Sequence, residues 1–185
     1  AINLSGGKLT SRLTKLDLYE GQGTGQLVLD GSRATPNIAA KFDLASIAAF
    51  PLLRDAADFE RLEGAGTINI DVTTSGNSQK AMMSALNGSG SVRFENGAIR
   101  GINIAQLTRN VLSAATSGWE SGGTQSTDFS ELGGNFTISQ GVLTNNDLKM
   151  LSPLVRVNGK GSVNMPNQTL NYRVEPKLAA TLEGQ

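Results

Sequence analysis

The chain has 185 residues, enough for one domain with a sizeable core, and its 16 lysine and arginine residues balance its 16 aspartate and glutamate residues. This zero net charge gives no reason to expect nucleic acid or an anionic surface as a partner. Histidine and cysteine are both absent, which excludes zinc sites of the usual kind, thiol nucleophiles and Ser-His-Asp arrangements.

The sequence starts with Ala1 directly in strand-like sequence, and it contains no apolar run near the ~20 residues that a membrane-spanning helix needs. Glycine is abundant, at 22 residues, and predicts many turns and short strands. We therefore interpret residues 1–185 as a single β-rich domain that is a fragment of a longer protein.

A pattern of Gly-x-Gly followed by alternating apolar and polar residues recurs along the chain. The copies are GTGQLVLDG (23–31), GAGTINIDV (64–72), GSGSVRFENG (88–97), GKGSVNMPNQ (159–168) and, more loosely, GGNFTISQG (133–141). Alternation with period two is typical of a strand with one buried face. The repeats therefore predict strands whose apolar side chains share one side of a sheet.

Three segments break the alternation. Residues 46–59 (SIAAFPLLRDAADF) have apolar residues at helical spacing, and Pro51 is expected to split this helix or to open its second half. Residues 77–86 and 103–116 each combine polar caps with an apolar face. We expect three short helices lying on the sheet, followed by a flexible Gly/Ser-rich loop at 117–127.

The last third of the chain is typical of a continuous β-meander. Strands are predicted near residues 135–139, 142–144, 148–150, 155–158, 162–165 and 169–174. Tight turns are predicted at 139–141 and 166–168, and Asn145-Asn146-Asp147 is interpreted as a further turn. Upstream, the Asn96-Gly97 pair predicts a hairpin turn, because both residues readily adopt positive φ angles.

The glycine pairs do not form a phosphate-binding loop. A dinucleotide fingerprint needs a third glycine and a following helix, whereas the copies at 64–69 and 88–93 lack that glycine and lead into strands. Gly159-Lys160-Gly161-Ser162 lacks the upstream glycine and the helix of a P-loop. Glycines that precede strands more often mark bulges, bends or tight connections.

Carboxylates offer one alternative, an acid/base pair near the end of the first predicted helix. Asp55 and Asp58 are three residues apart, and Glu60 and Glu63 follow. We favour a solvated helix end balanced by arginines, because charge runs on amphipathic helices usually face water. Asn145-Asn146-Asp147 has too few oxygen ligands for a calcium loop. The sequence thus predicts no catalytic residue, no metal site and no cofactor.

Two long blocks resemble the C-terminal region of the AsmA family. They are DFERLEGAGTINIDVTTSGNSQKAMMSALNGSGSVRFENGAIRGINIAQLTR (58–109) and TDFSELGGNFTISQGVLTNNDLKMLSPLVRVNGKGSVNMPNQTLNYRVEPKL (127–178). The shared pattern runs L-x-G-x-G from Leu86, T-x-F-x-x-L from Thr127 and S-P-L-x-R-V from Ser152, with Met165 where a leucine is expected.

The resemblance implies an envelope protein of Gram-negative bacteria. Members are usually anchored in the inner membrane by an N-terminal helix, which this sequence does not include, and extend into the periplasm. They are linked to outer-membrane biogenesis, and related proteins have long β-structures with an apolar groove proposed to carry phospholipids. No catalytic residue carries over from the family.

Together these observations predict a mainly β fold with a few short helices (α+β). The expected architecture is a curved, antiparallel-rich meander, shaped as a half-barrel or groove, with helices on part of it. The expected function is non-enzymatic binding or conduction of phospholipid or another acyl lipid along an apolar groove in the periplasm, with a structural or protein-interaction scaffold of the envelope as the alternative. The candidate lipid-binding residues are Val92, Phe94, Phe136, Ile138, Leu148, Met150, Val163 and Met165.

Overall fold

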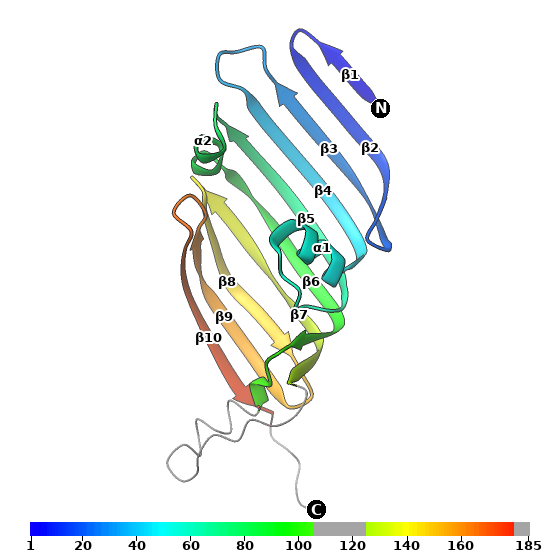
Figure 1. Cartoon of the computed structure of the whole chain (residues 1–185), viewed down its shortest axis with the longest axis vertical. Helices are drawn as coiled ribbons and strands as arrows, with labels where there is room; N and C mark the ends of the chain where they lie inside the picture. Colours follow the sequence, from blue (N-terminus) through cyan, green and yellow to red (C-terminus); the bar gives the residue numbers. More distant parts are fainter. Residues whose placement is uncertain (106–124, 180–185) are drawn as a thin grey trace, which may run out of the picture.

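A single antiparallel sheet makes up most of the computed structural model, which describes residues 1–105 and 125–179. Its strands follow one another in chain order, β1 to β10 (Figure 1). They are β1 (Ile2–Ser5), β2 (Lys8–Leu18), β3 (Gly21–Asp30), β4 (Asn37–Ala48), β5 (Ala65–Ser75), β6 (Asn87–Arg100), β7 (Ser126–Ser139), β8 (Val142–Leu151), β9 (Val155–Asn164) and β10 (Thr169–Leu178). The sheet is open, with β1 and β10 at its edges, and the predicted antiparallel meander is confirmed.

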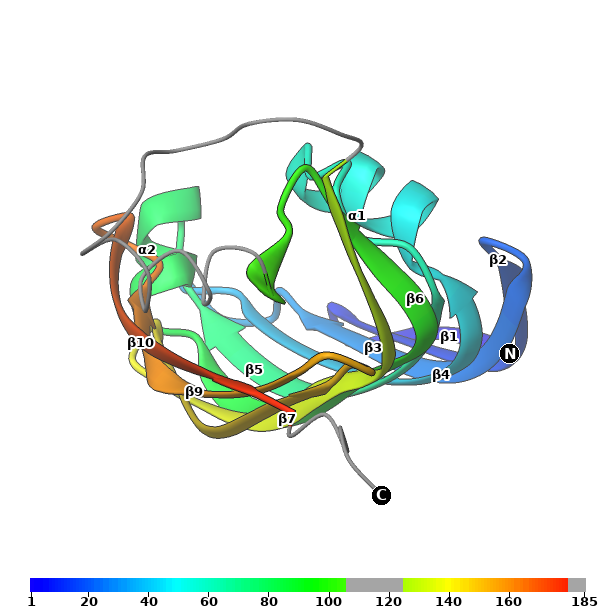
Figure 2. The ribbon, with the colours of Figure 1, turned by 90° about the horizontal axis from the view of Figure 1, so that it is seen from below.

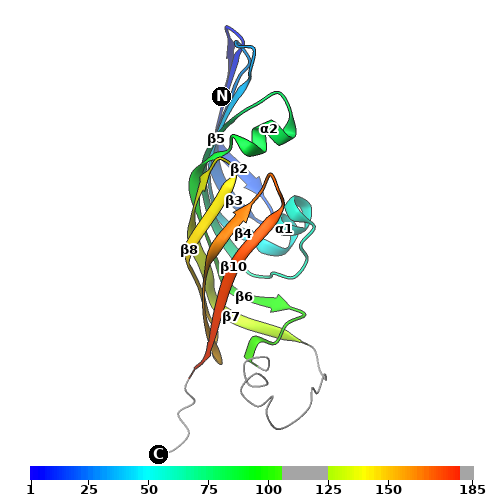
Figure 3. The same cartoon turned by 90° about the vertical axis from the view of Figure 1, so that its left-hand side faces the viewer.

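The sheet curves, and two short helices lie on its concave side (Figures 2 and 3). Helix α1 (Ala49–Ala57) is one continuous helix and not two pieces, because Pro51 occupies its first turn, where a backbone N–H has no partner within the helix. Helix α2 (Gln79–Ser84) starts after Ser78, whose hydroxyl accepts a hydrogen bond from the backbone N–H of Ala81.

The third predicted helix, at 103–116, lies largely outside the described residues. So does most of the predicted flexible loop at 117–127, although its last two residues, Ser126 and Thr127, are the first residues of β7.

Two predicted turns are wrong, because the chain continues through them as a strand. Asn96 has a positive φ of 49°, yet Glu95 pairs with Glu131 and Gly97 pairs with Phe129, so β6 is only bent there. At Asn145-Asn146-Asp147, strand β8 contains a β-bulge. The predicted strands 142–144 and 148–150 are therefore one strand, as are 155–158 and 162–165. The turns at 139–141 and 166–168 are confirmed.

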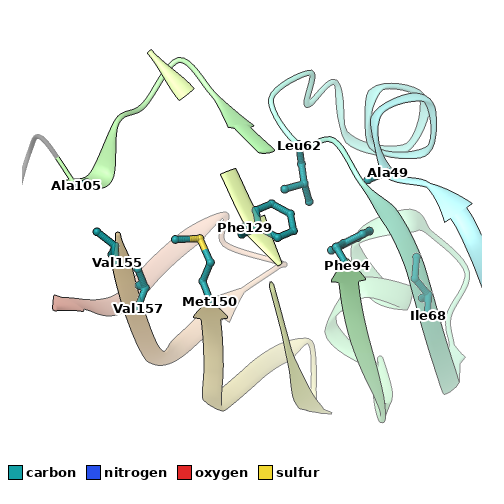
Figure 4. Packing of buried hydrophobic residues seen from close by; sticks show 9 residues of the cluster. All are labelled: Ala49, Leu62, Ile68, Phe94, Ala105, Phe129, Met150, Val155 and Val157. Carbon is teal, nitrogen blue, oxygen red and sulfur yellow. The ribbon is translucent and has the colours of Figure 1, made fainter. Parts of the chain in front are cut away.

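The bend at Asn96 determines where the core forms. Beyond it, β6 separates from β5 and pairs with residues 61–63, through hydrogen bonds between Glu63 and Ala98 and from Arg100 to Arg61. The C-terminal end of β6 and the N-terminal end of β7 thereby fold over the concave face (Figure 2). There, Leu62 and Phe129 pack with Phe94 and Met150 in the main hydrophobic cluster (Figure 4). One end of the concave face is thus filled by protein.

Candidate functional site

The two faces of the sheet differ sharply in polarity. On the concave face, a row of directly opposed residues runs Leu44, Ile68, Val92, and the neighbouring row contains Phe42, Ile70 and Phe136. The convex face carries polar residues at the alternate positions, including the opposed and ion-paired Lys41 and Asp71. Alternation along each strand, in register across the sheet, produces this separation.

In four of the Gly-x-Gly repeats the second glycine lies inside a strand opposite an aromatic residue, and not at a strand entrance as the sequence suggested, and the same holds for Gly97 at the end of the copy at 88–97. The directly paired residues are Gly25 with Phe42, Gly66 with Phe94, Gly90 with Phe136, Gly97 with Phe129 and Gly161 with Tyr172. A Cβ at Gly90 would lie 2.5 Å from the Phe136 ring, and one at Gly66 would lie 2.6 Å from the Phe94 ring. The glycines therefore make room for rings that lie across the neighbouring strand.

Seven of the eight candidate lipid-binding residues lie on the concave face, and they divide into two groups. Phe94, Ile138 and Met150 are buried, with exposures of 6%, 8% and 1%, so protein already covers them. The half-buried ones are Val92, Phe136, Leu148 and Val163. Met165 differs, because it follows the end of β9 and lies in the turn to β10.

Further apolar residues of this face were not among the predicted candidates. Leu4 and Leu170, on the edge strands, are 72% and 70% exposed. Phe42 and Ile70 are half-buried on the central strands β4 and β5. The same period-two alternation marks all four: Ile70 lies in the copy at 64–72, whereas Leu4, Phe42 and Leu170 lie in strands without a Gly-x-Gly start.

The helices cover only part of this apolar surface. Among the described elements, the close helix-to-strand contacts are those of α1 with β4 and of α2 with β5. Figure 3 shows both helices on the same side of the sheet, near different parts of its length. Neither α1 nor α2 makes such close contacts with β7 to β10.

A polar network holds the β8 bulge together. Asn145 donates to the carbonyl of Asn135 (2.7 Å) and accepts hydrogen bonds from the backbone N–H of Leu148 and the hydroxyl of Tyr172 (2.5 Å). Asp147 accepts from the backbone N–H of Asn135 (2.8 Å) and from its side chain. These side chains replace ladder hydrogen bonds that the bulge removes between β7 and β8.

Two pKa values report this network. The pKa of Asp147 lies below its usual value, chiefly because the Asn135 side chain and backbone N–H donate to the carboxylate. The pKa of Tyr172 is raised, first by burial of its phenol and then by the negative charge of Asp147. The network is satisfied within the sheet, which makes it a structural feature of the fold.

The convex face has a polar hollow of about 600 Å³ beside this bulge. It lies over Gly133 and Gly134, where side chains are missing, and its rim includes Asn69, Arg93 and Lys149. Its lining offers hydrogen bonds and charges in place of apolar contacts, so an acyl chain does not fit it.

The carboxylates of the enzymatic alternative are separated. Asp55 is ion-paired with Arg54 (2.9 Å) and Glu63 with Arg100, while Asp58 and Glu60 are exposed. Within residues 1–105 and 125–179, no group of three or more acidic side chains is placed to hold a metal ion. In the same residues, no helix is long and apolar enough to cross a membrane.

Comparison with known proteins identifies one similarity. The family model described as the AsmA family matches residues 1–148, about four fifths of the chain. No curated protein and no solved structure shows a significant match.

Proposed function

Because the chain belongs to the AsmA family, we propose that it is a non-enzymatic periplasmic module of outer-membrane biogenesis that binds or conducts lipid along its concave face. The ligand is a phospholipid or another acyl lipid. Family membership is consistent with an envelope-associated protein. The periplasmic location, attachment to the inner membrane and contact with other envelope proteins rest on the family resemblance alone.

The observation that carries the proposal is the apolar concave face, which the described residues 1–105 and 125–179 cover only in part. Phe136, Leu148 and Val163 lie on the concave side of three neighbouring strands, in different rows of the register, and remain half-buried. Large contiguous apolar surfaces on a folded protein are expensive to leave in water and commonly mark a binding surface. An acyl chain needs no directional hydrogen bonds, and the polar side chain of Asn145, opposite Phe136, already has its hydrogen bonds within the sheet.

The structure suggests different roles for the candidate residues. Val92, Phe136, Leu148 and Val163 are accessible enough to contact an acyl chain. Phe94 and Met150 belong to the packed cluster and would shape the closed end of the face. Conduction would proceed across the strands, since the apolar rows run perpendicular to them from β4 to β10.

Paired variants on the two faces test the proposal. Leu148→Asn with Val163→Thr makes the concave face of β8 and β9 polar, whereas Leu151→Asn with Val142→Thr makes the same kinds of change on the convex side of β8. The probe is cis-parinaric acid, whose fluorescence rises in an apolar site. We expect the concave pair to weaken probe binding at least about fivefold and the convex pair to leave it near wild type.

Native mass spectrometry of protein purified without detergent provides a second measurement, and we expect co-purifying lipid in the wild-type spectrum. Absence of lipid there, together with equal probe binding by both variant pairs, would remove the lipid proposal. In that case the scaffold function would account for the open sheet better.

A further inference from the structure

Charge is unevenly distributed along the chain although its total is zero. Between residues 142 and 178, on β8 to β10, there are five basic residues and two acidic ones, Asp147 and Glu175; the rest of the chain has 11 basic and 14 acidic residues. The basic residues, here called the basic patch, are Lys149, Arg156, Lys160, Arg173 and Lys177. The C-terminal third of the sheet therefore has a positive surplus.

The strand register gathers the basic patch on one face. Arg156 is directly opposite Lys177, and Lys160 is directly opposite Arg173. Lys149 pairs with Asn158, which lies on β9 two residues from Arg156 and two residues from Lys160, and therefore shares their face. Met150 and Val157, next to Lys149 and Arg156, point to the concave side, so the basic patch lies on the convex face, and all five of its residues are exposed.

These opposed pairs are unusual within this sheet. Elsewhere on the convex face, Lys8 is directly opposite Asp30 and Lys41 is opposite Asp71. One like-charged pair, Glu95 with Glu131, also occurs there, and Arg93 forms an ion pair with Glu131. Like charges directly opposite one another destabilise a sheet. Within the described residues, only Arg173 of the basic patch forms an ion pair, with Glu175. An anion from outside the chain would offset the repulsion between these opposed basic residues.

The edge strand itself indicates what kind of partner fits. Leu170 and Val174, on the concave side of β10, are 70% and 53% exposed. An added β-strand is a poor occupant, because Pro176 has no N–H to donate and edge lysines and prolines discourage strand addition. A surface that is anionic and has an apolar layer beneath fits both groups of side chains.

From this juxtaposition we infer that the basic patch and the exposed leucine and valine of β10 dock this edge of the sheet on a membrane surface with anionic lipid headgroups. The cations lie near the phosphates, and Leu170 and Val174 meet the interfacial region. The inference goes beyond the proposed acyl-chain binding and does not depend on it, because the basic patch lies on the convex face, opposite to the concave face that is proposed to bind the acyl chain.

Vesicle sedimentation of the whole chain tests the docking. Vesicles of phosphatidylglycerol and phosphatidylcholine are compared with vesicles of phosphatidylcholine alone, at low and high salt. We expect binding only to the anionic vesicles, and weaker binding as salt is raised. The triple variant Lys149→Gln, Lys160→Gln, Lys177→Gln should lose affinity on the order of a hundredfold, and it leaves the ion pair of Arg173 with Glu175 intact.

A matched triple variant distinguishes an effect of the basic patch from an effect of the net charge of the whole chain. Lys8→Gln, Lys15→Gln and Lys41→Gln change the net charge equally but lie on β2 and β4, distant from β10 in the strand order. We expect this variant to bind anionic vesicles like wild type, and circular dichroism should show both variants folded. Equal loss in the two triples would overturn the inference.

Two other outcomes would also overturn it. One is wild-type binding that does not distinguish the two kinds of vesicle. The other is binding of soluble polyglutamate through the same lysines with no binding to vesicles, which would assign the basic patch to an acidic protein partner. The concave variant Leu148→Asn with Val163→Thr should still bind vesicles, so failure of acyl-chain binding and failure of docking are distinguishable.

Discussion

Tyr172 shows how single residues define this sheet. Its ring crosses β9 above two glycines, so that a Cβ at Gly159 or Gly161 would lie 2.9 Å or 2.7 Å from a ring carbon. The hydroxyl then reaches Asn145 on β8. The glycines of Gly159-Lys160-Gly161, which resemble part of a phosphate loop, therefore leave the space that the Tyr172 ring occupies.

Substitution at Gly161 should be far more damaging than loss of the tyrosine hydroxyl. Gly161 has a φ of +158°, and an added Cβ would also meet the Asn171 carbonyl, so Gly161→Ala should cost about 2–4 kcal/mol of unfolding free energy. Tyr172→Phe should cost only about 1 kcal/mol, for one hydrogen bond. Urea unfolding measures both. Gly31→Ala, whose Cβ would make only an ordinary contact of 3.7 Å with the Gly7 carbonyl oxygen, is the control and should be nearly neutral.

Asp147 should give stability a dependence on acid pH. Its folded pKa is lowered, so its contribution is present above the ordinary aspartate pKa, ~4, and is lost as the pH falls through the lowered value. The urea midpoint of the wild type should therefore decrease in this acidic range, and Asp147→Asn should show a smaller decrease. An unchanged acid dependence in the variant would assign the effect to other carboxylates, such as Asp30, whose pKa is also lowered.

At the scale of elements, the strands were predictable and the bulges were not. Alternation placed Val92, Phe94 and Phe136 on one face, and the structure agrees. However, positive φ angles serve both a tight turn and a bend within a strand. Gln140 and Gly141 reverse the chain between β7 and β8, whereas Asn96, with the same φ of 49° as Gln140, does not.

The difference between these two sites comes from distant partners. Residues 126–131 pair with the second half of β6 and keep it extended, although some 30 residues of sequence separate them. A local pattern contains no information on that pairing. The same reasoning explains why candidate-site residues could be assigned to a face, while their burial, which depends on Leu62 and Phe129 folding over them, could not be predicted.

Asn96 should tolerate glycine and little else. Its left-handed conformation favours glycine or asparagine, so Asn96→Gly should change stability by less than about 0.5 kcal/mol, and Asn96→Ala should lower it by about 1 kcal/mol. Denaturant unfolding of both variants checks this, with the exposed neighbour variant Glu95→Ala as control. If alanine were accepted as readily as glycine at position 96, the bend would not depend on backbone conformation.

At the scale of the whole molecule, every described strand forms its ladder of backbone hydrogen bonds only with its neighbours in sequence. Stability is then close to a sum over adjacent strand pairs, as in repeat proteins. The central strands gain from two partners and from the core cluster on β5 to β9, whereas β1 has four residues and one partner. The sheet should loosen from its N-terminal edge.

Hydrogen exchange should follow this gradient. Amides of β1 that bond to β2 should exchange first, and those of β6 and β7 near Phe94 and Leu132 should be the most protected. Mass spectrometry of peptides after timed deuterium labelling measures the order. Uniform exchange across the sheet would instead mean that the ten strands open as one cooperative unit.

Strict neighbour-to-neighbour pairing also makes the width of such a protein easy to change in evolution. Duplicating or deleting one hairpin inserts or removes two adjacent strands. The ladders between the other strands stay as they are, and the apolar side chains stay on the same face of the sheet. A protein of this design can grow by tandem copying until it spans a required distance, without inventing a new topology.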